Sequence, residues 1–115
     1  RPSTLATVPI GYGDGVPRNL GLAGAEALVG GVRRPVVGVV TMDQLVLDCT
    51  DGPPVQLGDE VVLLGKQSVE PPGRGESIGA WEWAERLDTI AYEIVTRLGP
   101  RLPRRYLGGA ALQLR

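Results

Sequence analysis

A tyrosine set among glycines is the feature of this 115-residue chain best suited to chemistry, in the run Gly11-Tyr12-Gly13-Asp14-Gly15. Glycine lets the backbone take positive φ angles and lets another surface approach closely, so such a loop can hold a phenol forward. A phenol is a poor base near neutral pH because its ordinary pKa is about 10, and a nearby cation favours the phenolate. The same run also fits a simple turn with its tyrosine packed at the rim, and the pattern alone leaves both interpretations open.

Two other polar positions are candidates for binding. Met42-Asp43-Gln44 interrupts an apolar run. This segment is either a strand end that turns its backbone N–H groups toward a ligand or a bend with a half-buried methionine. Tyr92-Glu93 lies in a helical pattern, and by itself it is typical of a helix whose tyrosine hydroxyl reaches solvent.

Several classes of site and partner are excluded by the composition. The chain has no histidine and one cysteine, Cys49, so the usual structural zinc sets and the Cys-His nucleophile pair cannot form, and we expect no metal site. No phosphate loop of the Walker or dinucleotide type is present. Twelve Lys and Arg against 13 Asp and Glu give a net charge of −1, which argues against nucleic acid or an anionic membrane as the main partner.

Cysteine usage and hydropathy bear on location. A single cysteine allows no intrachain disulfide, so a reducing, cytoplasmic setting is the simplest interpretation. No apolar run reaches the ~20 residues that span a membrane, and no segment resembles a signal peptide. The chain begins without methionine in what reads as a strand, so we expect a fragment of a longer protein.

Short apolar runs separated by glycine and proline predict the elements that hold these residues. The 17 glycines and 10 prolines are typical of an all-β fold. Gly30-Gly31 predicts a hairpin turn, Gly38 a bulge or a close backbone approach, and residues 67–75 a polar, mobile loop. The expected strands are residues 4–10, 27–29, 35–40, 45–47 and 60–64.

Two short helices are predicted near the C-terminus. Ser77 offers an N-cap, and residues 78–87 place an apolar side chain, Trp81 among them, at every third position. A second helix is expected over residues 90–98, ended by Gly99-Pro100.

The predicted elements form one domain over residues 1–115. A last short strand is expected at residues 104–107. The predicted fold is mainly β, a small β-barrel or sandwich with one short helical hairpin near the C-terminus.

Taken in order, these segments resemble the C-terminal domain of the pyridoxal phosphate-dependent alanine racemases. Residues 8–18 resemble the family's catalytic-tyrosine segment, and residues 38–44 resemble its Met-Asp-Gln segment. Three later stretches, residues 55–65, 83–97 and 101–104, also match in the same order. The resemblance therefore covers nearly the whole chain.

The resemblance implies a full-length enzyme that interconverts L-alanine and D-alanine for cell-wall peptidoglycan. Its N-terminal α/β barrel, absent from this chain, would hold pyridoxal phosphate on a lysine. Lys66, the only lysine here, does not match that residue and is most simply solvated. In the implied head-to-tail homodimer, this domain of one subunit completes the active site of the other, so we expect the domain alone to be inactive.

The resemblance also implies roles for four residues. Tyr12 would be the base that acts on the Cα proton of L-alanine, and a lysine of the barrel would serve the D-alanine face. The cation that favours its phenolate would come from outside this chain. Met42 would offer its backbone N–H to the substrate carboxylate, with Asp43 supporting that strand end, and Tyr92 would hydrogen-bond the cofactor phosphate.

Two departures from the family pattern keep alternatives open. Gly13 stands where the family more often has alanine, and Val39 stands where it often has arginine, in the channel that leads to the site. The second departure leaves a racemase for serine or another small amino acid as an alternative. A non-catalytic β module that binds a partner chain through the Tyr12 loop is the other.

Overall fold

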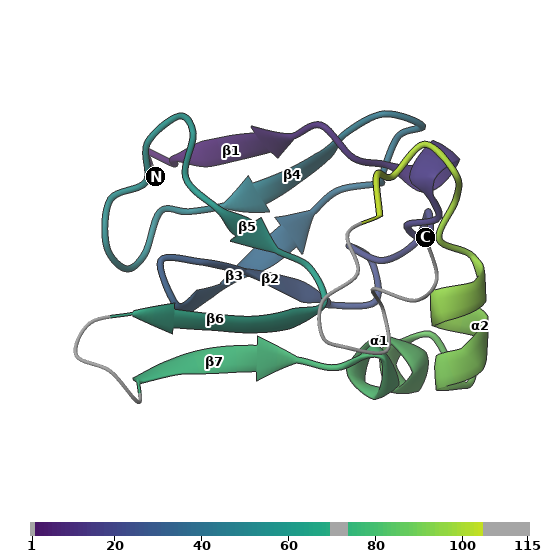
Figure 1. The fold of residues 1–115 in the computed structure, drawn as a ribbon. Helices are drawn as coiled ribbons and strands as arrows, with labels where there is room; N and C mark the ends of the chain where they lie inside the picture. The colour runs from purple at the N-terminus through teal and green to yellow at the C-terminus, as the bar shows by residue number, and fades with distance from the viewer. Residues whose placement is uncertain (1, 70–73, 105–115) are drawn as a thin grey trace.

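The computed structural model describes residues 2–69 and 74–104, and its main element is a curled, five-stranded antiparallel sheet, a half-barrel (Figure 1). Along the sheet the strand order is β1-β4-β3-β2-β5. The five strands are β1 (Leu5–Val8), β2 (Glu26–Val29), β3 (Val32–Val37), β4 (Leu45–Asp48) and β5 (Val61–Val62). Before β2 the chain forms a short 3-10 helix, η1 (Tyr12–Asp14).

A second, two-stranded antiparallel sheet and a helical hairpin complete the domain. The sheet consists of β6 (Gly65–Val69) and β7 (Arg74–Ile78), and it runs below the main sheet in Figure 1. The helices α1 (Ala80–Arg86) and α2 (Ala91–Thr96) follow and lie at one end of the sheets. The predicted mainly β fold with one short helical hairpin near the C-terminus is confirmed. Neither helix in the described part of the chain is long and apolar enough to cross a membrane.

Glycines set two of the predicted strand boundaries. Gly30 and Gly31 have φ angles of 65° and 72° and join β2 to β3 in a tight hairpin, with Val29 opposite Val32. Two successive positive φ angles are what a two-residue hairpin turn requires, so the prediction of a hairpin here is confirmed. Gly38, at φ 74°, follows the end of β3, which therefore stops short of the residue 40 expected from the sequence.

The prediction of a polar loop over residues 67–75 is wrong, because the described part of this segment forms β6 and β7. Gln67 explains how a polar sequence can be a strand here. Its buried side chain accepts a hydrogen bond from the Gly31 N–H at 2.8 Å and donates to the Glu60 carbonyl at 3.1 Å. The glutamine thus satisfies backbone groups of the neighbouring turn instead of facing solvent.

The first helix begins later than the sequence suggested. Ser77 is not an N-cap but a β7 residue opposite Lys66, and Gly79 precedes the helix in an extended conformation. The helix therefore buries Trp83, which is 1% exposed, whereas Trp81 is 65% exposed. The expected last strand at residues 104–107 falls, beyond residue 104, outside the described residues.

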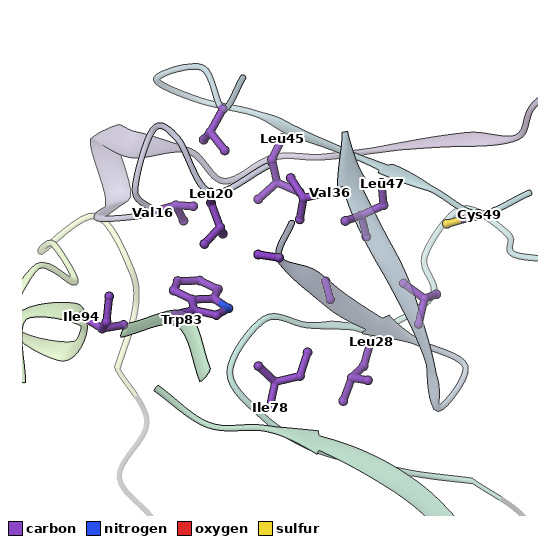
Figure 2. Packing of buried hydrophobic residues seen from close by; sticks show 14 of the residues in the cluster. Val16, Leu20, Leu28, Val36, Leu45, Leu47, Cys49, Ile78, Trp83 and Ile94 are labelled. Atoms are coloured by element: carbon purple, nitrogen blue, oxygen red, sulfur yellow. The ribbon is translucent and has the colours of Figure 1, made fainter. Parts of the chain in front are cut away.

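The buried core lies between the main sheet and the helical hairpin. Figure 2 shows the indole of Trp83 in the middle of an apolar cluster that draws on the sheet, β7, both helices and residues 16–25. The chain has no phenylalanine, and in the described core this indole is the one buried aromatic ring. Its burial fixes the helical hairpin against the sheet.

An ion-paired cluster also holds the hairpin in place. Arg33 of β3 donates to both carboxylate oxygens of Glu82 on α1, at 2.8 and 2.9 Å, and to Glu26 of β2 at 3.3 Å. The Arg33 guanidinium holds the pKa of Glu82 below its usual value. A bidentate pair of this kind has a fixed geometry, so it holds the first turn of α1 in place against β3.

Candidate active site

The tyrosine loop is a tight turn that only glycine can flank. A Cβ added at Gly11 would collide with the Thr41 carbonyl oxygen, and one added at Gly15 would collide with the Arg97 carbonyl oxygen. Gly15 also has φ 105°, a conformation that side-chain-bearing residues rarely adopt. Between them, Tyr12 is 47% exposed. The glycines thus allow close backbone approach on both sides while the phenol stays accessible.

Backbone hydrogen bonds dock this turn on the Met-Asp-Gln segment. The Tyr12 N–H donates to the Thr41 carbonyl and the Gly13 N–H donates to the Met42 carbonyl, both at 2.9 Å. The Thr41 N–H in turn donates to the Gln44 carbonyl at 2.9 Å, which closes a turn over residues 41–44. Two segments far apart in sequence therefore lie side by side, and Tyr12 and Met42 are brought together.

The Met42 backbone N–H remains available within this turn. Among the described residues, no carbonyl or side-chain acceptor takes a hydrogen bond from it. The Met42 side chain is 45% exposed, so the turn is open to solvent in this chain. A free N–H at an exposed turn can bind an anionic group such as a carboxylate.

Asp14 lies inside the tyrosine turn and ties it to the C-terminal segment. Asp14 is 6% exposed, and its carboxylate accepts hydrogen bonds from the Arg101 Nε–H at 2.9 Å and the Gly11 N–H at 3.1 Å. Together these bonds, that from Arg101 first, hold the pKa of Asp14 below its ordinary value. The Asp14 carbonyl also accepts the Gly99 N–H at 2.9 Å.

Arg101 contacts the Met-Asp-Gln turn as well. Its Nη1 lies 3.1 Å from the Asp43 carboxylate, and its Nη2–H donates to the Met42 carbonyl at 3.4 Å. The Asp43 side chain itself is 67% exposed. Sequence reasoning did not pair Asp14 with Arg101. They are 87 positions apart, and the one signal for them was their place inside two segments that resemble the same family.

A shallow depression borders the tyrosine. It has a volume of about 350 Å³ and is lined by Tyr12, residues 15–18 and Arg97 of the segment after α2. Val39, which is 50% exposed, borders a separate depression with Arg18, Asn19 and Leu22. Its apolar side chain gives that surface no charge of its own.

Tyr92 stands apart from the other candidates. It lies on α2 and is 78% exposed. Within the described residues its hydroxyl makes no hydrogen bond to the tyrosine turn or to Asp43. Lys66 lies on β6, in the hairpin well separated from η1 in Figure 1. The structure thus brings together Tyr12, Met42 and Asp43, and within its described residues the phenol of Tyr92 has no hydrogen-bond partner.

Comparison with known proteins identifies the family. A sequence profile described as alanine racemase, C-terminal domain, matches residues 1–106. This chain belongs to the alanine racemase C-terminal domain family. The roles of the individual site residues are not tested by that match, and they stay predictions.

Individual alanine racemases agree with this assignment in sequence and in structure. That of Symbiobacterium thermophilum is 50% identical over 111 residues, which cover 96% of this chain and 28% of that protein. The crystal structure of the one from D-cycloserine producing Streptomyces lavendulae has a TM-score of 0.75 at 42% identity, covering 93% of this chain and 26% of that one. The one from Bartonella henselae with covalently bound pyridoxal phosphate has a TM-score of 0.78 at 37% identity, covering 93% and 27%. The chain therefore spans about a quarter of the length of these relatives.

Proposed function

We propose that this chain is the C-terminal domain of a pyridoxal phosphate-dependent racemase that interconverts L-alanine and D-alanine. The observation that carries the proposal is the docking of the Tyr12 turn on the Met42 turn, with no acceptor for the Met42 N–H among the described residues. That docking supports the proposal, because the phenol of Tyr12 could exchange a proton and the N–H of the adjacent Met42 turn could hold a carboxylate. An amino-acid racemase needs both within the length of one substrate.

Tyr12 and Met42 have separate tasks in this reaction. The Met42 N–H holds the carboxylate of L-alanine and so fixes the direction of its Cα–H bond. The Tyr12 phenol oxygen takes the Cα proton on the L face, or returns a proton there when D-alanine is the substrate. Asp43 keeps the Met42 turn in shape through its ion pair with Arg101. The D face needs a second base, which we assign to a lysine outside this chain.

The cofactor supplies chemistry that no side chain of this domain can. When bound, pyridoxal phosphate acts as an electron sink that makes the Cα–H acidic. Tyr92 fits the group, because it is exposed and its hydroxyl, which has no partner among the described residues, can donate a hydrogen bond to a phosphate. Lys66, on the β6–β7 hairpin, does not fit as the covalent attachment. The lysine that holds the cofactor would therefore lie outside this domain, in the roughly three quarters of the relatives' length that this chain does not match.

The proposed racemase also requires a cofactor-binding domain and a second subunit. An N-terminal α/β barrel would carry the cofactor lysine, and a second subunit would supply the barrel that Tyr12 faces in a homodimer. Small amino acids are the substrates, and D-alanine for peptidoglycan is the product in a cytoplasmic setting. The buried, free thiol of Cys49 supports a reducing compartment. The named relatives favour alanine over serine as the substrate.

The test is the Tyr12→Phe substitution in the full-length protein. We expect kcat for L-alanine to fall by about 10²- to 10⁴-fold, the usual range for loss of a general base. Absorbance of the bound cofactor should be unchanged, because Tyr12 is not proposed to hold it. Normal turnover by the Phe variant would contradict the role of Tyr12 as the base. Absence of alanine turnover by the unaltered full-length protein would contradict racemisation and favour a non-catalytic module. Faster turnover of L-serine than of L-alanine by the unaltered protein would reassign the substrate.

A further inference from the structure

Three segments of the chain meet at the guanidinium of Arg101. Its Nε–H donates to the Asp14 carboxylate of the tyrosine turn at 2.9 Å. Its Nη1 pairs with the Asp43 carboxylate at 3.1 Å, and its Nη2–H donates to the Met42 carbonyl at 3.4 Å. These partners are separated from Arg101 by as many as 87 residues in sequence. One side chain therefore bridges the two turns that the proposed function uses.

The shape of the guanidinium makes this bridge rigid. An arginine presents its N–H donors as a planar fork with fixed angles, whereas a lysine offers a single point charge. The three nitrogens of Arg101 bind two separate turns. The fixed spacing of these nitrogens therefore limits how far apart the two turns can lie. On one side the bridge continues through Asp14 to the Gly11 N–H, directly before Tyr12.

Gly13 shows how closely the fork covers the tyrosine turn. A Cβ added there would lie 2.6 Å from Arg101 Nη2 and 3.0 Å from Met42 Cγ. The guanidinium therefore packs on the residue that follows Tyr12, with the Met42 side chain next to it. Arg101 touches the turn at its interior, through Asp14, and at its outer surface, through Gly13.

We propose that Arg101 is a positioning residue for racemisation, which holds the Tyr12 turn and the Met42–Asp43 turn at the separation that proton transfer needs. The proposal rests on the function proposed above. Arg101 does not itself take or give the proton. It sets where the Tyr12 phenol stands relative to the N–H that binds the substrate carboxylate. A displacement of about 1 Å in such a pair can cost about 10²-fold in rate.

The test uses the full-length holoenzyme with Arg101→Met, which keeps an unbranched stem as long as that of arginine up to Nε and removes the guanidinium fork. Arg86→Met is the matched control, because it makes the same change at an exposed arginine in the last turn of α1. We expect Arg101→Met to raise KM for L-alanine and to lower kcat by about 10- to 100-fold. The primary isotope effect with Cα-deuterated L-alanine should also increase, while that with Cα-deuterated D-alanine should not. Arg101→Lys should recover only part of the loss.

Those readouts separate positioning from simple loss of folded enzyme. A smaller folded fraction lowers apparent kcat and leaves KM and both isotope effects unchanged, and that result would overturn the proposal. If Arg101→Met does not fold, Asp43→Asn removes one anchor of the bridge without exposing the buried Asp14 carboxylate. The same isotope effects are then measured on Asp43→Asn. An unchanged isotope effect with Cα-deuterated L-alanine would again overturn the proposal.

A double variant distinguishes this inference from the proposed function. If Arg101 acts through Tyr12, Arg101→Met should have little further effect on kcat once Tyr12 is phenylalanine. Full additivity of the two losses would refute the inference and leave Tyr12 as the base. Full activity of Tyr12→Phe would refute the role of Tyr12 as the base, whatever the result for Arg101, whereas no racemisation by the unaltered full-length protein would refute the proposed function itself.

Discussion

Asp14 gives the tyrosine turn a dependence on pH at the scale of a single residue. The pKa of this carboxyl lies below its ordinary value, because the Arg101 hydrogen bond, and then the Gly11 N–H, favours the charged form. A group of this kind stabilises the fold above the unfolded-state pKa of about 3.9. That contribution is lost as the pH falls through the lower, folded-state pKa.

Asp14→Asn should therefore destabilise the chain at neutral pH and lose that effect in acid. We expect its unfolding free energy to lie below that of the unaltered chain from about pH 7 to about pH 4. The difference should shrink as the pH falls further. Urea unfolding followed by circular dichroism at a series of pH values measures it. Glu85→Gln, which removes an exposed carboxylate from α1, is the control, and a pH-independent difference for Asp14→Asn would contradict the assignment.

The sequence predicts the accessible site residues better than it predicts their support. Tyr12 is conspicuous because glycines flank it, and Met42-Asp43 because it interrupts an apolar run. Arg101 has no such local signal, since its partners are Asp14 and Asp43, which only the folded topology brings near. Long-range ion pairs depend on where every intervening element runs, and no spacing within one segment encodes that.

At the scale of elements, the first helix shows how a boundary decides which residue is buried. Ile78 is buried, as its place in the predicted apolar face suggested, but it belongs to β7 and not to the helix. Counting helical turns from Ile78 therefore puts Trp81 inside and misses Trp83. The β6–β7 hairpin was not predicted because its sequence is polar. Gln67 of β6 hydrogen-bonds backbone groups that only the tertiary structure brings near.

The burial of Trp83 instead of Trp81 can be tested directly in the isolated chain. Trp83→Ala should cost about 3–5 kcal/mol of unfolding free energy, because it leaves a cavity in the core. Trp81→Ala should change it by less than about 0.5 kcal/mol, since its side chain is 65% exposed. Trp83→Phe should cost less than Trp83→Ala, because it keeps a ring and also removes a buried indole N–H that has no partner in the described structure. Urea unfolding measures all three, and equal losses for the two alanine variants would contradict the placement.

At the scale of the whole molecule, the described residues bury a continuous apolar core, whereas the proposed site residues are exposed. Its buried cluster includes Trp83 and strands from across the sheet, as a domain that folds independently requires. In contrast, Tyr12, Met42 and Tyr92 are all well exposed, and Lys66 lies on the β6–β7 hairpin. Sequence patterns predict the fold because the turn residues and the apolar residues of the core all lie within the chain. They do not predict the groups that would face the exposed Tyr12, which the proposed function assigns to another domain.

The isolated chain should therefore fold and yet fail to racemise alanine. We expect circular dichroism to show a cooperative thermal transition, because the core is formed by the chain itself. With pyridoxal phosphate and L-alanine added, chiral chromatography should detect no D-alanine above a protein-free control. The full-length protein, assayed alongside at the same molar concentration, should form it readily. D-alanine production by the folded chain alone would show that this domain holds both bases, and would move the second one from an outside lysine to a residue within these 115.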